Sequence, residues 1–474
     1  MRIRDLYIEN FKCIDRAELR SLGNVILITG PNGSGKTALL DAIRLWKRGL
    51  GVYSGRSRAI PQVFGQIVTI GKEFGTISVT LQLSPDEREA LNTEKTELTA
   101  TINIRPDGTI ANRTGDSQEL RTLFSDRFLD DSRVGIMEHI PSNRSFRSDP
   151  VQALAFSPSR LEEERAKILE DTFNKFDQLK ADLVWMHFAD LQAREKGETS
   201  PSFIEGIKRI FRDFLDDVEF LGVDLDPRLS RPARFPVRTP RGEHEIDQLS
   251  SGQKEVLMVY SLLEKRKFAN SVILFDEPEL HLHGALERKV LGYIRKLAQC
   301  GNQFFIATHS PEIIGSVTTE DVYRFTGGQP NICEKIDLNS ERISVLRQLG
   351  ATFHIQMISE KIVFVEGKSD REVLSRLAPK VEHKASIVPC SGAIALGKAT
   401  ELLNRAAKFD NFRAIRDRDL LSDTEIEEQE AKYEGKLHIW RKRTIENYLL
   451  DEEALFAWLQ KVPESWLKTN TRLE

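Results

Sequence analysis

The strongest constraint on the fold is a glycine-rich loop that joins an apolar run to an amphipathic helix. The loop reads GPNGSGKT at residues 30–37, and the apolar run VILI at residues 25–28 precedes it. Residues 37–47 follow with apolar side chains at three- and four-residue spacings, including Leu39 and Ile43, which form one face of a helix. Strand, glycine loop and helix are the order that surrounds a phosphate with backbone N–H groups. The sequence therefore predicts an α/β fold with a nucleotide site.

Each part of this loop has a defined role in binding ATP. Glycine is needed where the backbone approaches the phosphates closely. The Lys36 ammonium would bridge the β- and γ-phosphates, and the Thr37 hydroxyl would take one Mg²⁺ position. The predicted ATP-binding residues of the loop are Asn32, Gly33, Ser34, Gly35, Lys36 and Thr37.

Two later apolar runs end in side chains suited to ATP hydrolysis. The run VILF at residues 272–275 precedes Asp276, which would hold Mg²⁺, and Glu277, which would polarise the attacking water. The run FFIAT at residues 304–308 precedes His309. This histidine lies where ABC-type ATPases, which these motifs resemble, carry their switch histidine. We therefore predict catalytic roles for Glu277 and His309.

The segment LSSGQ at residues 249–253 resembles the signature motif of the same ABC family. The free N–H groups at the start of the following helix are suited to a γ-phosphate. Because the family's signature contacts ATP on the partner subunit, the resemblance implies a head-to-head homodimer that encloses two nucleotides. The candidate signature residues are Ser251, Gly252 and Gln253.

The rest of the chain predicts two domains. Residues 66–112 alternate in polarity and indicate an antiparallel β meander. Apolar positions at helical spacing over residues 161–191 indicate a helical insertion at about residues 155–220. We expect an ATPase domain at residues 1–355 and a second domain at residues 356–474.

Acidic residues follow two apolar runs of the second domain. The run KIVFV at residues 361–365 precedes Glu366, and the segment FRAIRDRD at residues 412–419 ends in Asp417 and Asp419. The period of a strand puts these two aspartates on one side. In a parallel sheet the carboxyl ends of the strands meet at one edge, so the three carboxylates should converge there.

This arrangement resembles the Toprim domain of OLD-family nucleases, with its glutamate–glycine turn and Asp-x-Asp strand. The segment TIENY at residues 444–448 matches a later acidic motif of that family. The resemblance implies a Rossmann-like Toprim domain and an ATP-dependent endonuclease of bacterial antiphage defence, as in the Gabija, PARIS and retron-linked systems. It assigns metal binding to Glu366, Asp417 and Asp419, all three also catalytic, with support from Asp370 and Glu446. Carboxylates without His or Cys favour Mg²⁺ or Mn²⁺.

Composition limits the partners further. A formal net charge of −4 excludes a generally basic protein, so nucleic-acid contacts would come from local patches. One such patch is an arginine-rich loop at residues 231–241, for which a structural role is favoured, and another is Arg144 with Arg147. No apolar run is long enough to span a membrane, and the N-terminus lacks a secretion signal. We expect a cytoplasmic protein.

Three functions remain open. The first is a nuclease acting on DNA, which is favoured, or on RNA, under the control of ATP and of a defence partner or phage trigger. The second is an ATP-gated sensor or scaffold that binds such a trigger or effector, with a non-catalytic Toprim domain. The third is an SMC-like DNA-binding repair ATPase, although residues 161–191 could supply only a stub of the long coiled-coil arms of that class.

Overall fold

The computed structural model divides the chain into two units, Met1–Leu338 and Asn339–Glu474. It describes residues 1–51, 67–128, 131, 133–144, 179–197, 202–215, 217–225, 233–266, 268–316, 321–336, 361–377, 385–390, 392–394, 396–397, 400–401, 412–433, 435–444 and 447. The boundary predicted at residue 355 lies outside these residues, so its position stays a prediction.

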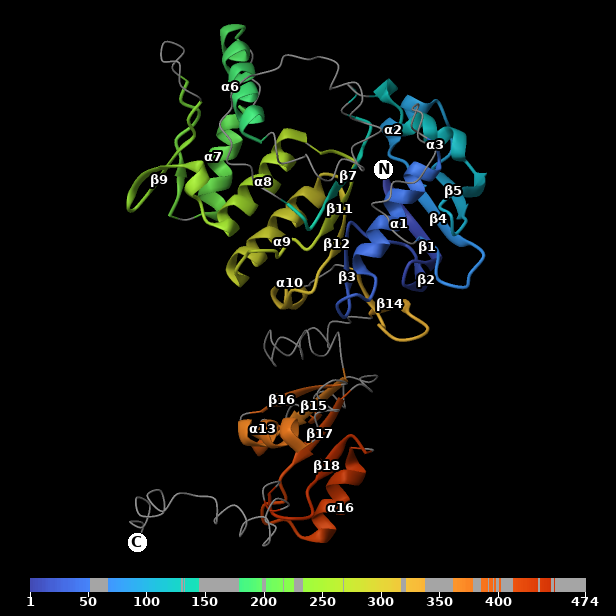
Figure 1. The fold of residues 1–474 in the computed structure, drawn as a ribbon, viewed down its shortest axis with the longest axis vertical. Coiled ribbons are helices and arrows are strands. Elements are labelled where there is room, and N and C mark those ends of the chain that lie inside the picture. The colour runs from blue at the N-terminus through green and yellow to red at the C-terminus, as the bar shows by residue number, and fades with distance from the viewer. Residues whose placement is uncertain are drawn as a thin grey trace. The chain divides into compact units, whose positions relative to one another are not determined.

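A mixed sheet organises the first unit (Figure 1). Its strands are β1 (Arg2–Phe11), β2 (Ile14–Leu19), β3 (Val25–Thr29), β4 (Gly75–Gln82), β5 (Glu97–Ile104), β6 (Ile110–Gly115), β7 (Met137–Ile140), β11 (Val272–Asp276), β12 (Gln303–Ala307), β13 (Asp321–Phe325) and β14 (Ile332–Ile336). Over the described part of the chain they lie in the order β6-β5-β4-β1-β2-β14-β13-β3-β12-β11-β7. The strands that precede the nucleotide motifs, β3, β12 and β11, are adjacent and parallel. The sheet therefore aligns the predicted ATP-site segments at one edge.

The burial of each strand follows from its sequence. Strands β3, β11 and β12 are apolar throughout and are buried at every position. Strand β4 alternates buried and half-buried residues, with Ile77, Val79 and Leu81 facing inward. The antiparallel pairing of β4, β5 and β6 confirms the predicted meander. The prediction missed helix α2 (Pro85–Leu91), which a Ser84–Glu87 capping box begins.

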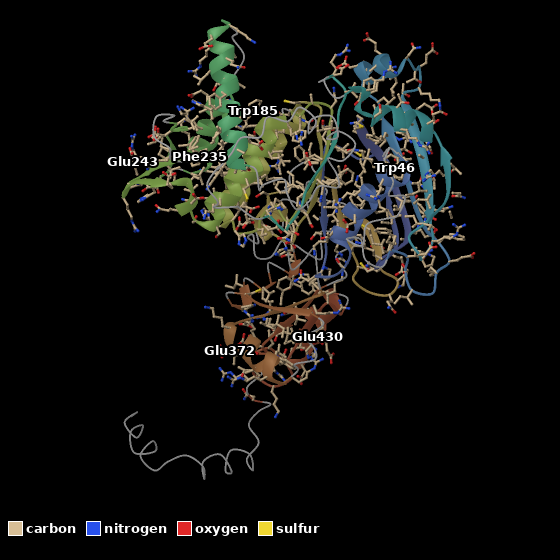
Figure 2. The ribbon with its side chains drawn as sticks, turned by 45° about the horizontal axis from the view of Figure 1, so that its top comes forward. Trp46, Trp185, Phe235, Glu243, Glu372 and Glu430 are labelled. Atoms are coloured by element: carbon tan, nitrogen blue, oxygen red, sulfur yellow. The ribbon has the colours of Figure 1, made fainter. Side chains whose placement is uncertain are left out.

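Helices cover both faces of this sheet. Helix α1 (Lys36–Gly49) packs beside the antiparallel strands, where the Trp46 indole donates a hydrogen bond of 2.8 Å to the Ala100 carbonyl (Figure 2). A second buried cluster contains residues of α7 (Phe203–Phe214), α8 (Ser251–Arg266) and α9 (Gly284–Gln299). Smaller elements are α3 (Ser117–Leu123), α10 (Pro311–Gly315) and the short strands β8 (Glu219–Phe220), β9 (Pro236–Thr239) and β10 (Gly242–Glu245).

The predicted helical insertion is described in part. Helix α6 (Leu179–Glu195) packs against α7, and Leu179 and Leu183 are buried as expected. Residues 161–178 of the predicted helical region lie outside the described residues. None of the described helices combines the length and apolar composition needed to cross a membrane.

The second unit contains a parallel sheet. Its strands are β15 (Lys361–Val365), β16 (Ala385–Pro389), β17 (Phe412–Arg416) and β18 (Leu437–Ile439), and its longer helices are α13 (Lys368–Leu377) and α16 (Asp423–Lys432). The strands lie in the order β16-β15-β17-β18. The chain moves from β15 to one side and then returns past it to β17. In such sheets ligands bind at the carboxyl edge where the strand order reverses, here between β15 and β17.

Candidate nucleotide and metal sites

The phosphate loop has the backbone that close approach to an anion requires. Gly30 and Gly35 have φ values of 145° and 112°, in the region that side chains disfavour. A Cβ atom added at Gly30 would lie 2.7 Å from the Ser34 hydroxyl oxygen. A pocket of about 1110 Å³ lies along this loop and is lined by Asn32, Gly33 and Ser34, among others. The lining of this pocket does not include Lys36 or Thr37, so the loop backbone and not the pocket defines the candidate phosphate site.

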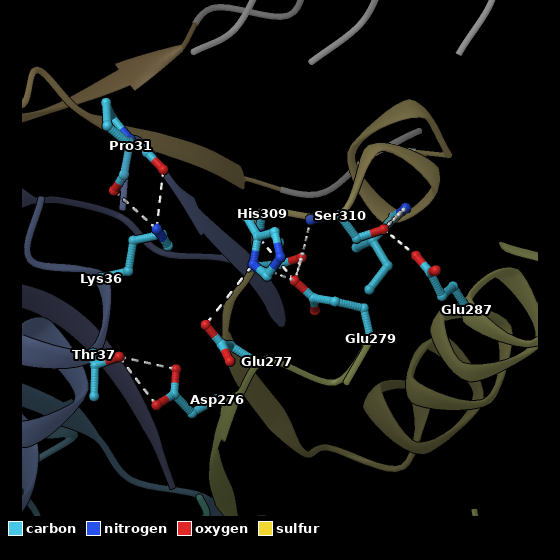
Figure 3. A network of polar contacts seen from close by, with 12 residues as sticks. Pro31, Lys36, Thr37, Asp276, Glu277, Glu279, Glu287, His309 and Ser310 are labelled. Carbon is cyan, nitrogen blue, oxygen red and sulfur yellow. Dashed lines mark hydrogen bonds and ion pairs between the residues drawn. The ribbon is translucent and has the colours of Figure 1, made fainter. Parts of the chain in front are cut away.

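Lys36 and Thr37 lie at the start of α1, beside the end of β11 (Figure 3). The Lys36 ammonium donates hydrogen bonds of 3.0 Å to the Gly30 and Pro31 carbonyls. The Thr37 hydroxyl lies 3.1 and 3.2 Å from the two carboxylate oxygens of Asp276. The structure therefore brings together the two predicted oxygen ligands of the nucleotide-associated Mg²⁺.

Burial shifts the pKa values of these groups. Desolvation raises the pKa of Asp276 to about 6, although the Thr37 hydrogen bond opposes the shift. Burial lowers the pKa of Lys36, and the nearby charges of Glu277 and Asp276 oppose that shift. A divalent cation at Thr37 and Asp276 fits this donor set because hard oxygen ligands suit Mg²⁺.

Glu277 and His309, which were each predicted to act in hydrolysis, lie close together. The His309 Nδ1 atom is 3.8 Å from Glu277 Oε1 and 3.1 Å from Glu279 Oε1 (Figure 3). Glu279 also accepts hydrogen bonds from the His309 amide at 2.8 Å and the Thr308 hydroxyl at 2.9 Å. Burial raises the pKa of Glu279. Glu279 thus orients the histidine, a role that sequence reasoning missed.

The sequence does contain a signal for Glu279. It is an acidic residue two positions after Glu277 in the segment DEPE at residues 276–279. Nothing local identifies its histidine partner, which is 30 residues away.

The signature segment forms the beginning of α8. The Ser250 amide donates to the Gln253 side-chain oxygen at 3.0 Å, and the Gln253 amide donates back to the Ser250 hydroxyl at 3.4 Å. This reciprocal pair makes Gln253 part of a helix cap. A Cβ atom added at Gly252 would lie 2.6 Å from the His281 carbonyl oxygen, so glycine permits this close packing. Ser251, Gly252 and Gln253 line a pocket of about 360 Å³.

Asn331 supports the phosphate loop from a distant part of the sequence. Its side-chain amide donates to the Ser34 carbonyl at 2.6 Å and to the Cys13 carbonyl at 2.7 Å. Asn331 and Ser34 are 297 residues apart, so no local pattern could have identified the contact.

In the second unit, Glu366 and Asp417 meet at the carboxyl edge of the sheet. Parallel pairing aligns Val365 of β15 with Ile415 of β17 just before them. The Asp417 amide donates a hydrogen bond of 3.3 Å to the Glu366 carboxylate. Burial raises the pKa of Glu366, and the negative charge of Asp419 adds to the shift. The Glu366 carboxylate therefore meets the backbone of Asp417, while the convergence of all three carboxylates stays a prediction.

The reason given for this convergence was wrong in one part. Strand β17 ends at Arg416, before either aspartate, so strand periodicity does not align Asp417 with Asp419. Asp419 lies in a turn with φ of 51°, where its amide donates to the Arg443 carbonyl at 3.2 Å. The turn, not the strand, sets its position.

The structure describes Asp370, one of the two predicted supporting ligands, but not the other, Glu446. Asp370 is buried in the first turn of α13, where its carboxylate accepts a hydrogen bond of 2.7 Å from the Gly367 amide. It therefore fixes the glutamate–glycine turn. Glu446 lies outside the described residues, so its predicted role stays untested.

The described residues do not form a ready-made metal cluster. Within them, no group of three or more His, Cys, Asp or Glu side chains could hold a metal ion. The oxygen-only donor set at Glu366 and Asp417 fits Mg²⁺ or Mn²⁺ in type. Metal binding there remains a proposal.

Where it is described, the arginine-rich segment forms strands and ion pairs, as the favoured structural interpretation predicts. Arg234 forms an ion pair with Glu245 at 2.7 Å, and Arg238 pairs with Glu219 and Glu243, each at 3.0 Å. These pairs join the strands of the small β8–β10 sheet. The interpretation of the other basic site, Arg144, as a nucleic-acid contact is wrong because this side chain is buried.

A protein-family model identifies the first unit. The model described as "AAA domain, putative AbiEii toxin, Type IV TA system" matches residues 25–315, which is more than half of the chain. The chain belongs to this AAA-domain family. The match to the AAA-domain family spans the phosphate loop, the signature segment and the strand that ends in Asp276.

Curated relatives of this AAA-domain protein include three nucleases by name. The OLD nuclease of Thermus scotoductus is 23% identical over 82% of this chain and 77% of its own length. The Old nuclease of Escherichia phage P2 is 29% identical over 33% of this chain, and Endonuclease GajA of Bacillus cereus is 23% identical over 28%. The chain covers only 29% and 24% of the lengths of these two. The resemblance to the OLD family is thereby confirmed.

A solved SMC head bound to the C-terminal winged-helix domain of ScpA aligns with a TM-score of 0.46. The sequence identity is 17%, and the alignment covers 72% of this chain and 98% of the other.

Proposed function

We propose that the protein is an ATP-dependent nuclease, in which an ABC-type ATPase controls a metal-dependent Toprim site that cuts nucleic acid. One observation carries this proposal: Glu366 and Asp417 come together at the switch point of a parallel sheet, in a chain that also has a nucleotide site. The relatives named as nucleases support it.

In the proposed ATPase, different residues bind the phosphates, the Mg²⁺ ion and the attacking water. The phosphate loop and Lys36 bind the phosphates, while Thr37 and Asp276 would hold Mg²⁺, which neutralises charge on the phosphate oxygens. Glu277 accepts a proton from the attacking water or orients it. His309, held by Glu279, senses the γ-phosphate. Ser251 and Gly252 complete the site of a second copy, so the active form is a homodimer.

For the nuclease, Glu366, Asp417 and Asp419 would hold one or two Mg²⁺ or Mn²⁺ ions, with Asp370 and Glu446 in support. Such ions activate water and stabilise the leaving oxygen of a phosphodiester. Glu366 would also take up a proton from the attacking water. We propose DNA as the favoured substrate, RNA as the other, and a cytoplasmic role in antiphage defence with a phage trigger or partner protein.

A cleavage assay tests the nuclease. Purified protein is incubated with plasmid, single-stranded DNA and transfer RNA, with Mg²⁺ or Mn²⁺ and with or without ATP. Glu366→Ala and Asp417→Ala should each abolish cleavage, because they remove metal ligands, while ATP hydrolysis is retained. Glu372→Ala is the matched control, since this carboxylate is exposed on α13. Nucleic acid left intact by the wild-type protein under every condition would contradict the proposal.

The second candidate is the ATP-gated sensor or scaffold. It is favoured by one observation, that the part of the chain described here contains no complete metal cluster. Full antiphage activity of Asp417→Ala, together with a stable partner in pull-downs, would establish it in place of the nuclease.

A further inference from the structure

Arg144 links the backbone of Asp276 and Glu277 to the signature helix α8. It lies just after β7, and its side chain has no exposed surface. Its guanidinium donates 2.9 and 2.8 Å hydrogen bonds to the carbonyls of Asp276 and Glu277. It also donates to the Pro141 carbonyl and forms an ion pair with Glu255. The planar guanidinium, with several donors in fixed directions, makes this set of contacts possible.

Glu255 lies one turn after the signature residues that open α8. Its side chain is 3% exposed, and burial raises its pKa while the Arg144 charge opposes the shift. At the other end of α8, Arg266 lies 3.6 Å from Glu138 of β7, which is completely buried. Helix α8 is thus tied at its start to the segment just after β7 and at its end to β7 itself. We call Glu138, Arg144, Glu255 and Arg266 the β7 clasp.

Glu277 is a residue whose position needs such support. It has φ of 47°, a conformation that is strained for a residue with a side chain. Its amide donates to the Ala307 carbonyl at 2.9 Å, and its carbonyl accepts from Arg144 at 2.8 Å. The backbone amide and the backbone carbonyl of Glu277 are therefore both held by hydrogen bonds.

Stability alone does not explain the buried ion pair. Desolvation of two charges offsets most of their attraction, and apolar residues of similar volume are often equally stabilising. A charged clasp is useful where it fixes geometry, since a small displacement of a catalytic group slows the reaction strongly.

We propose that Arg144 is a positioning residue for ATP hydrolysis, which couples the backbone of Asp276 and Glu277 to the signature helix through Glu255. The inference rests on the proposed ATPase function. A signature helix that contacts ATP of a second copy would thereby influence the Glu277 carboxylate of its own subunit.

The decisive variant is the full-length double substitution Arg144→Met/Glu255→Leu, which removes both charges together. We expect its thermal midpoint to fall less than that of Arg144→Met alone, because no buried charge is left unpaired, and its ATP KM to stay near the wild-type value. Its kcat should fall about 10- to 100-fold, because Glu277 loses its fixed position. Arg144→Met alone should also lower the thermal midpoint, since it leaves Glu255 buried without its arginine.

Two further variants make the result unambiguous. Leu98→Ala, in the buried face of β5, lowers stability without touching the site and should keep the wild-type kcat. Arg144→Lys preserves the charge pair but cannot reach both carbonyls, so it should fold and still lose kcat.

The outcomes separate the two proposals. A folded double variant with wild-type kcat would overturn the role of Arg144; if that variant does not fold, a folded Arg144→Lys protein with wild-type kcat would do the same. A wild-type protein that hydrolyses no ATP would instead overturn the proposed function, and this inference with it.

Discussion

The side chains of the nucleotide site are charged groups held in a largely buried environment. Lys36 and Asp276 are 8% and 2% exposed. Burial lowers the pKa of Lys36 and raises the pKa of Asp276, and both shifts favour the neutral form. Glu277 is more accessible, with a side chain 32% exposed. Groups buried in this way interact strongly with a charged ligand because water screens them little. Substitution of a single one of these residues should therefore weaken nucleotide binding strongly.

Substitution of Lys36 tests this dependence. Mg²⁺ and ATP should raise the thermal midpoint of the wild-type protein, equivalent to about 2.7 kcal/mol at a ligand concentration 100 times Kd. Lys36→Ala should remove most of this shift, because the phosphates lose their buried cation. The measurement is thermal unfolding with and without ligand. Lys95→Ala, an exposed lysine paired with Asp116, should keep the full shift.

Sequence reasoning identified the residues that act through local motifs. The contact between Thr37 and Asp276 was predictable, because each residue belongs to a motif in which polar residues follow a buried strand. It missed Asn331 and gave Arg144 the wrong role, and the partners of these two residues lie 297 and 132 residues away. An amide or a guanidinium in a polar segment has no periodicity of its own, so only the fold reveals what it binds.

Among the described elements, helix α8 begins in a tightly packed turn. Gly252 lies against the His281 carbonyl, and His281 itself has φ of 62°. The helix cap of Ser250 and Gln253 fixes the same turn. The N-terminus of α8 therefore has little room to adjust.

A pair of glycine substitutions tests this fit. Gly252→Ala should destabilise the protein by roughly 1–3 kcal/mol, because its Cβ atom would clash with the His281 carbonyl. Gly292→Ala, inside α9 with no atom within 4 Å of the added Cβ, should instead stabilise it by about 0.5–1 kcal/mol. Denaturant unfolding measures both. Equal effects of the two substitutions would contradict the tight packing at Gly252.

Elements with a clear period were predicted well, and elements fixed by tertiary contacts were not. The alternation of β4 and the apolar runs of β3, β11 and β12 match the sheet. Helix α2 was missed because it is short and interrupts an alternating region. The extent of β17 was overestimated by three residues, 417–419, because a charged segment carries no signal for the end of a strand.

For the whole molecule, the signature and the phosphate loop belong to the same unit, and by family resemblance they act on different copies of it. A mixing experiment tests this arrangement. Lys36→Ala and Ser251→Arg should each be inactive alone in ATP hydrolysis. Mixed in equal amounts, they should regain activity, because one site of the mixed dimer has an intact loop and an intact signature. A mixture that hydrolyses no more ATP than its two components would contradict the head-to-head homodimer.

The place of β3 in the sheet has a consequence for biosynthesis. This strand lies between β12 and β13, and Asn331 holds the phosphate loop that follows it. All of these partners are encoded about 300 residues later, and contacts so distant in sequence form slowly. A nascent chain on the ribosome therefore exposes the loop long before it can be completed. Nucleotide can assist only the last stage of folding, after residue 331 has emerged.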